Sequence, residues 1–196
     1  HLETAGALEP RGMSLKGAMK VFGDIFIDII VSVLLGRTVV LCNDIDIAIT
    51  LYNTISRVVA GGATLGKEVW ILEDCAEAPD DSFVVNCRYS VLVRGTAEHE
   101  ARKTISRYLS EAVTVGDNEA AVLFIRQKIS ALLRAADILE SEIKGRTLAR
   151  KALTIIESKS GITVRYDDLH IVLAILRSRG RDDIVESIVM GQLDGF

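Results

Sequence analysis

The amino-acid sequence predicts an α/β fold with a small, at least partly parallel sheet of about three to four strands, followed by an α-helical C-terminal half. Three observations predict it. The runs Thr38–Cys42 and Glu68–Leu72 are short and apolar, which is typical of strands buried on both faces. The helical pattern of Ile45–Val59 lies between them and supplies the crossover that parallel strands need. From Asp117 onward, apolar residues recur at three- and four-residue spacing, as in helices that pack on a core.

Length and composition suit one folded unit. The chain has 196 residues, 49% of them hydrophobic and 26% charged, which excludes a disordered chain and allows a sizeable core. We assign residues 13–116 to the α/β half and residues 117–196 to the helical half, packed together because no linker-like stretch separates them. Residues 1–12 are interpreted as an extension or a cloning remnant outside the fold. The net charge of −4 gives no general attraction to nucleic acid or to an anionic membrane.

The first element, Leu15–Leu35, is predicted to be one helix that is apolar on most faces and therefore packed on more than one side. Its most apolar part, Ile25–Leu35, contains Asp28 and is only 11 residues long, which is too short to span a bilayer. We therefore predict a core helix and no transmembrane segment.

The second helix, Ile45–Val59, begins beside two carboxylates, and either Asp44 or Asp46 can cap it. The stripe of this helix that we expect to be buried comprises Ile45, Ala48, Ile49, Tyr52, Ile55 and Val59.

Further along the chain, Phe83–Val93 alternates polar and apolar residues and is predicted to be a single strand. A short additional strand is considered at Ala112–Val115. Asp167-Asp168 and Asp182-Asp183 are expected to cap the last two helices. The helices predicted in this part of the chain are Thr96–Glu111, a long helix capped by Asp117, Thr147–Lys159, and two short helices at about 167–178 and 182–190.

The three cysteines are Cys42, Cys75 and Cys87, an odd number with gaps of 33 and 12 residues. They form no Cys-x-x-Cys pair, so neither a zinc knuckle nor a thioredoxin-type site is indicated. Cys42 and Cys87 fall in apolar runs and are expected to be buried thiols. A reducing compartment fits free thiols best, so we expect a cytoplasmic protein.

Motifs for catalysis or metal binding are weak. The run GGATLGK at 61–67 has the glycine and lysine spacing of a phosphate loop, but a helix precedes it, a strand follows it and Glu68 stands at the metal-binding position. Glu98-His99-Glu100 has no second histidine four residues on, and His170 lies among apolar residues. We therefore predict no catalytic residue, no metal site and no cofactor, and an enzyme is the less favoured class.

Two surfaces are candidate binding sites. Asn43, Asp44 and Asp46 follow the first strand, where open α/β sheets place ligands, although helix capping explains the aspartates without a ligand. Basic residues around Gly180 form the second surface, which would contact a phosphate or an acidic partner unless they only complement a helix dipole. These basic residues are Arg177, Arg179 and Arg181.

The residues of Leu34–Val59 and the order of the elements resemble one known family. LLGRTVVLCND followed by the helix IDIAITLYNTISRVV, then a strand, an acidic loop, a longer strand and a helical tail, is similar to the DENN module, nearest to its folliculin type. The likeness in element order covers about Val21–Val189. It implies a non-enzymatic regulator that binds a small GTPase or a companion subunit within a larger assembly, and it assigns no catalytic residue.

We therefore expect a non-catalytic interaction or regulatory module that acts through protein partners, with small-GTPase regulation as the function that the resemblance adds. The alternative is a small-ligand or nucleotide-binding α/β domain that uses the loops after Cys42 and Leu72. A further alternative is DNA binding through the C-terminal helices, which the overall charge does not favour.

Overall fold

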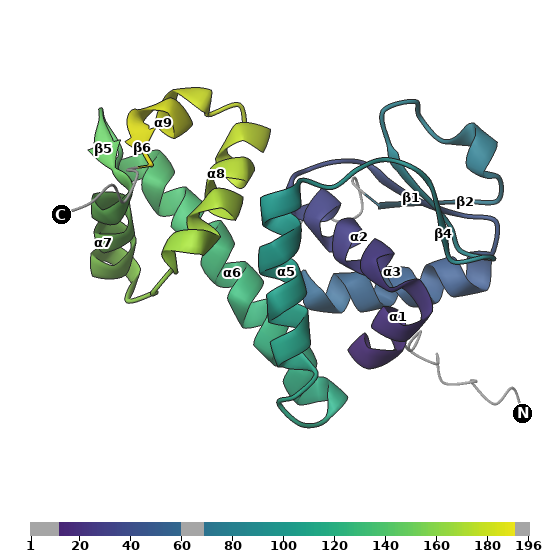
Figure 1. Ribbon diagram of the computed structural model, residues 1–196. Coiled ribbons are helices and arrows are strands. Elements are labelled where there is room, and N and C mark those ends of the chain that lie inside the picture. Colours follow the sequence, from purple (N-terminus) through teal and green to yellow (C-terminus); the bar gives the residue numbers. More distant parts are fainter. Residues whose placement is uncertain (1–11, 60–68, 191–196) are drawn as a thin grey trace, which may run out of the picture.

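The sheet of the N-terminal half contains β1 (Val39–Cys42), β2 (Val69–Leu72), β3 (Phe83–Asn86) and β4 (Val91–Arg94) in the order β2-β1-β3-β4. The computed structural model describes residues 12–59 and 69–190 (Figure 1). β1 is parallel to β2 and to β3, and β4 is antiparallel to β3. The predicted fold class is therefore confirmed: a mostly parallel four-stranded sheet precedes a C-terminal half of helices. The phosphate-loop-like run 61–67 lies outside the described residues.

The crossover helix α3 (Ile45–Val58) connects β1 to β2, as predicted. Its buried face differs from the predicted stripe. Ile45 and Ile49 are 37% and 38% exposed, because the face that packs on α6, β1 and β2 is rotated away from them. The apolar residues that this helix buries are Ala48, Leu51, Ile55 and Val58.

The predicted single helix at Leu15–Leu35 is two helices, α1 (Leu15–Phe22) and α2 (Asp24–Leu34). Gly23 separates them with a φ of +55°, a left-handed conformation that glycine adopts without steric cost. Every residue from Phe26 to Leu34 is buried, which confirms a core helix. Within the part of the chain that the structure describes, no helix is long and apolar enough to cross a membrane.

The predicted strand Phe83–Val93 is a hairpin, so that prediction is wrong. The side-chain oxygen of Asn86 accepts hydrogen bonds from the N–H groups of Arg88 and Tyr89, which starts a turn. Ser90 has a φ of +52° and completes the reversal into β4. The alternation of polar and apolar residues continues through this turn by coincidence. The turn could therefore not be predicted from that alternation.

The helices that follow β4 are α5 (His99–Ala112), α6 (Asn118–Glu142), α7 (Ala149–Ser160), α8 (Leu169–Ser178) and α9 (Asp182–Ser187). Asp117 caps α6 as predicted, since its carboxylate accepts from the N–H of Ala120. The strand considered at Ala112–Val115 is absent, because those residues are the last turn of α5 and the turn after it. Two short strands also form a parallel pair, β5 (Thr147–Leu148) and β6 (Ile188–Val189), where sequence analysis had extended the neighbouring helices.

Helix α5 occupies the centre of the molecule. It packs against α2 on the side of the sheet and against α6 and α8 on the other side (Figure 1). Ala101, Ile105 and Leu109 of α5 are fully buried. They belong to one hydrophobic cluster that runs from α1 to β6.

Candidate functional site

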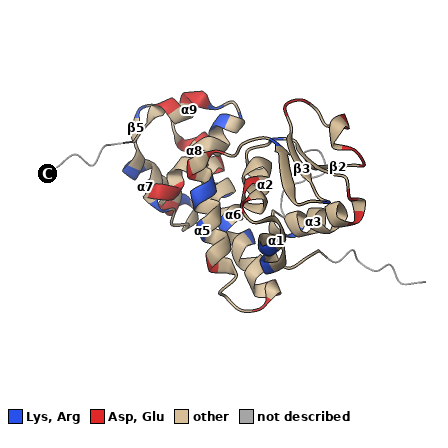
Figure 2. Cartoon of the chain, turned by 45° about the vertical axis from the view of Figure 1, so that its right-hand side comes forward, with Lys and Arg blue, Asp and Glu red and all other residues tan. Residues whose placement is uncertain are grey.

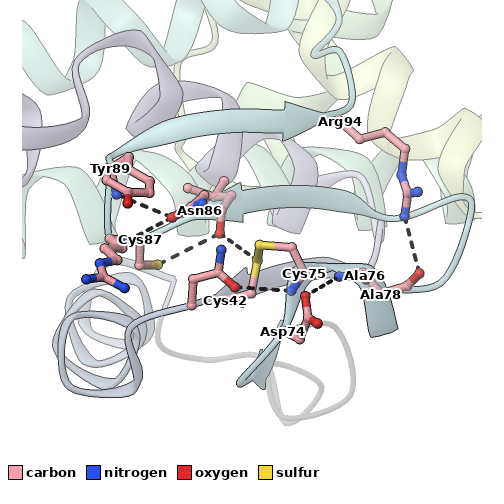
Figure 3. Close-up of a disulfide and its surroundings, with 12 residues drawn as sticks. Cys42, Asp74, Cys75, Ala76, Ala78, Asn86, Cys87, Tyr89 and Arg94 are labelled. Atoms are coloured by element: carbon pink, nitrogen blue, oxygen red, sulfur yellow. Dashed lines mark hydrogen bonds between the residues drawn. A yellow bond between two sulfur atoms is a disulfide. The ribbon is translucent and has the colours of Figure 1, made fainter.

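The carboxyl ends of β1, β2 and β3 meet at one edge of the sheet, where the predicted ligand loop lies (Figure 3). Asn43, directly after β1, has a φ of +72°, which its short polar side chain tolerates better than most. Its N–H donates to the Leu72 carbonyl, and its side-chain oxygen accepts from the N–H of Cys75, both at 3.3 Å. Asn43 therefore ties the end of β1 to the end of β2.

The aspartates of the predicted ligand loop serve helix α3. Asp44 accepts from the N–H of Ile47 at 3.0 Å, which confirms the capping role. Asp46 lies exposed in the first turn, where a carboxylate complements the helix dipole. Within the described residues, no group of three or more His, Cys, Asp or Glu side chains could hold a metal ion. The internal hydrogen bonds of Asn43 and Asp44 thus explain this loop as a structural connection.

A disulfide joins Cys42, the last residue of β1, to Cys75, so the prediction that Cys42 is a free thiol is wrong (Figure 3). The two Cα atoms are 5.2 Å apart although 33 positions separate the residues in sequence. The parallel register explains the proximity. Cys42 pairs with Leu72, and the 3₁₀ turn η1 (Cys75–Glu77) folds back over the end of β1.

The disulfide holds one end of the connecting segment, Glu73–Ser82, and Arg94 holds the other. The Arg94 guanidinium donates to the carbonyls of Ala78 and Pro79 and to the Ser82 hydroxyl. Figure 3 shows Arg94 and the disulfide at opposite ends of this segment. Beneath it lies a small apolar cluster of Val40, Cys42, Ala78 and Val84. The connecting segment is thus the cover of one face of the sheet.

Cys87 is a free, fully buried thiol, as predicted. Burial raises its pKa from 9.0 to about 12, because desolvation disfavours the thiolate. A thiol that stays protonated at neutral pH is a poor nucleophile. Cys87 therefore packs in the hydrophobic core and is not expected to act as a nucleophile.

The structure separates the three arginines of the predicted basic surface. Arg179 contacts Asp137 at 2.7 Å and Glu140 at 3.2 Å, so it ties the end of α8 to α6. Arg181 contacts Glu140 at 3.1 Å and Asp183 at 3.0 Å. Its guanidinium lowers the pKa of the Asp183 carboxyl through a hydrogen bond. Figure 2 shows acidic residues on α9 and both basic and acidic residues on α7.

Arg177 lines a hollow with a volume of about 350 Å³ between α2, α5 and α8. The chain on either side of the strands also contributes to it: Arg37 follows α2, and Glu98 precedes α5. Nothing local in the sequence indicates that Arg37 and Glu98 lie beside Arg177, so Arg37 was not predicted as a site residue and Glu98 was considered only as a metal ligand. The residues that line the hollow are Leu35, Arg37, Glu98, Ala174, Arg177 and Ser178.

Two buried carboxylates attach α5 to both halves. Asp28 of α2 forms a two-pronged ion pair with Arg102, with both N–O distances at 2.6 Å. Asp168 does not cap its helix through its side chain, which corrects the prediction. Its carboxylate accepts from three side chains of α5. Burial, and then this carboxylate, raise the pKa of the tyrosine among them. These three side chains are Thr104, Arg107 and Tyr108.

Comparisons with known proteins assign no family to this chain. No protein-family model matches it, and no curated protein or solved structure matches it either. The DENN resemblance therefore stays a prediction that depends on element order and on Leu34–Val59.

Proposed function

We propose that this chain is a non-catalytic interaction module that binds a protein partner along the outer edge of β4. A small GTPase or a companion subunit is the partner class that the DENN resemblance implies. The single observation that carries the proposal is the exposed apolar surface of the β3–β4 hairpin. Tyr89 is 67% exposed, and Val91, Leu92 and Val93 are 46%, 37% and 52% exposed.

The position of β4 at the edge of the sheet indicates which kind of partner segment this surface can bind. β4 pairs with β3 on one side, and within the described residues no strand pairs with its other side. An edge strand presents unpaired N–H and C=O groups that can hydrogen bond to another extended chain. An exposed run of apolar residues on such an edge is a common mark of a docking site. The proposed occupant is an extended, apolar segment of the partner, added as a fifth strand.

The alternatives draw less support from the geometry. A nucleotide or small ligand would bind at the strand ends, but Asn43 and Asp44 already serve backbone N–H groups there. DNA binding would use the terminal arginines, but Arg179 and Arg181 already have carboxylate partners. The expected cytoplasmic location depended on free thiols, and the disulfide removes that reason, because structural disulfides persist mainly in oxidising compartments.

Quantitative affinity purification with the tagged full chain tests the proposal. Val93→Lys places a charge on the β4 edge, and Leu123→Lys places the same charge on α6, where Leu123 is 53% exposed. We expect Val93→Lys to lose at least one protein that the wild type and Leu123→Lys both retain, with an unchanged melting temperature. Equal recovery of every protein with Val93→Lys would refute the edge as the docking site. Strong thermal stabilisation by a nucleotide would favour the ligand-binding alternative instead.

A further inference from the structure

The hollow between α2, α5 and α8 combines two arginines from distant parts of the chain. Arg37 follows α2 and Arg177 lies in the last turn of α8, 140 positions later. The volume of the hollow, about 350 Å³, falls at the small end of the range for ligand pockets, about 300–1,000 Å³. Leu35 and Ala174 add an apolar part to its lining. We infer that this hollow binds an acidic segment of a protein partner, with a carboxylate held between Arg37 and Arg177; this rests on the proposed function.

The two arginines are available for an external carboxylate. The Arg177 side chain is exposed and, within the described residues, makes neither a hydrogen bond nor an ion pair, unlike the side chain of Arg179 two positions later. Arg37 is also exposed and donates one N–H to the Thr96 carbonyl, which fixes the guanidinium and leaves its other donors free. A planar guanidinium matches the two oxygens of a carboxylate, so these donors favour an acidic side chain.

Glu98 narrows the choice of occupant. It is the acidic residue of the hollow, and it repels a doubly charged phosphate more strongly than a singly charged carboxylate. Its Oε2 is buried and has no hydrogen-bond partner within the described residues. A buried acceptor without a donor costs free energy, so an occupant with an N–H next to its carboxylate gains a hydrogen bond there. A peptide backbone beside an acidic side chain supplies both groups, which favours an acidic peptide over nucleic acid or a lipid phosphate.

Fluorescence polarisation with the full chain tests this inference. The probe is a short labelled peptide of alternating Glu and Leu with blocked ends, and the control peptides carry Gln or phosphoserine in place of Glu. We expect Arg37→Ser and Arg177→Ser each to weaken binding of the Glu peptide by about tenfold or more. Arg134→Ser is the matched control, because Arg134 on α6 is exposed and lies outside the hollow, and it should change binding by less than about twofold.

The ratio of the affinities for the Glu peptide and the phosphoserine peptide gives a second measurement, which tests the role of Glu98. Glu98→Gln should reduce the preference for the Glu peptide over the phosphoserine peptide. Equal weakening by Arg134→Ser, equal binding of the Gln peptide, or no binding up to about 1 mM would each overturn the inference. If Val93→Lys removes a partner while Arg37→Ser and Arg177→Ser leave every partner and the Glu peptide unaffected, the proposed function stands and this inference fails. If Arg37→Ser and Arg177→Ser weaken binding of the Glu peptide while Val93→Lys retains every partner, the hollow stands as the acidic-peptide site and β4 is refuted as the docking site.

Discussion

Reduction of the Cys42–Cys75 disulfide should lower the free energy of unfolding by about 4 kcal/mol. The bond closes a loop of 33 residues, and the entropy that such a cross-link removes from the unfolded chain corresponds to about that value at 25 °C. Guanidinium chloride unfolding, with and without a phosphine reductant, measures the effect. At a typical denaturant slope for a chain of this size, the midpoint should fall by roughly 1 M.

Cys87 makes the assay easy to interpret. Its thiol is buried and its pKa is raised to about 12, so it should react slowly in the native chain. Fast thiol titration of the folded protein should therefore detect no thiol before reduction, and after reduction it should detect Cys75, which is half-buried. The double variant Cys42→Ala, Cys75→Ala should unfold like the reduced wild type. A midpoint that stays within about 0.2 M after titration has verified reduction would refute the reasoning.

Three further predictions concern the core. Ile129→Ala should cost about 2–5 kcal/mol, while Ile49→Ala should cost less than about 1 kcal/mol, since Ile129 is 2% exposed and Ile49 is 38% exposed; equal denaturation midpoints would contradict the assigned helix faces. Asp168→Asn should cost about 2–4 kcal/mol by chemical denaturation, because an amide cannot accept from all three of the α5 donors; a loss below about 0.5 kcal/mol would show that the carboxylate is not needed. Between pH 9 and about 12 the unfolded chain loses the Cys87 proton while the native chain keeps it, so stability should fall as the pH rises, by up to about 1.4 kcal/mol per pH unit. Cys87→Ala should remove that part of the slope, and an identical slope in this variant would contradict the raised pKa.

Features that depend on neighbouring residues could be predicted from the sequence. Asp44 and Asp117 cap their helices because capping needs only the next three residues. Gly161 ends α7 with a φ of +70°, which is also a local signal. The parallel pair β1 and β2 followed from two apolar runs and the helix between them. The fold class and the capping roles of Asp44 and Asp117 could therefore be assigned before the structure was known.

Features that depend on distant residues could not be predicted in this way. The sequence spacing of Cys42 and Cys75 does not show that η1 folds back over β1. Asp168 has the position of a helix cap, and only the packing of α5 against η2 gives its carboxylate a different role. The hollow was missed for the same reason, because Arg37 and Arg177 approach each other only after the two halves pack together.

The ion pair between Asp28 of α2 and Arg102 of α5 has a consequence for the order in which the chain folds on the ribosome. Asp28 is 4% exposed in the finished protein, but its partner Arg102 is synthesised 74 residues later. Until Arg102 emerges, packing α2 would bury a charge without a partner, which is unfavourable. The residues before α5 are therefore expected to complete their core only after α5 leaves the exit tunnel, although nascent domains often fold from the N-terminus onward. Ribosome-bound chains that end before α5 should stay sensitive to protease, and chains in which α5 has emerged should gain protection of α2.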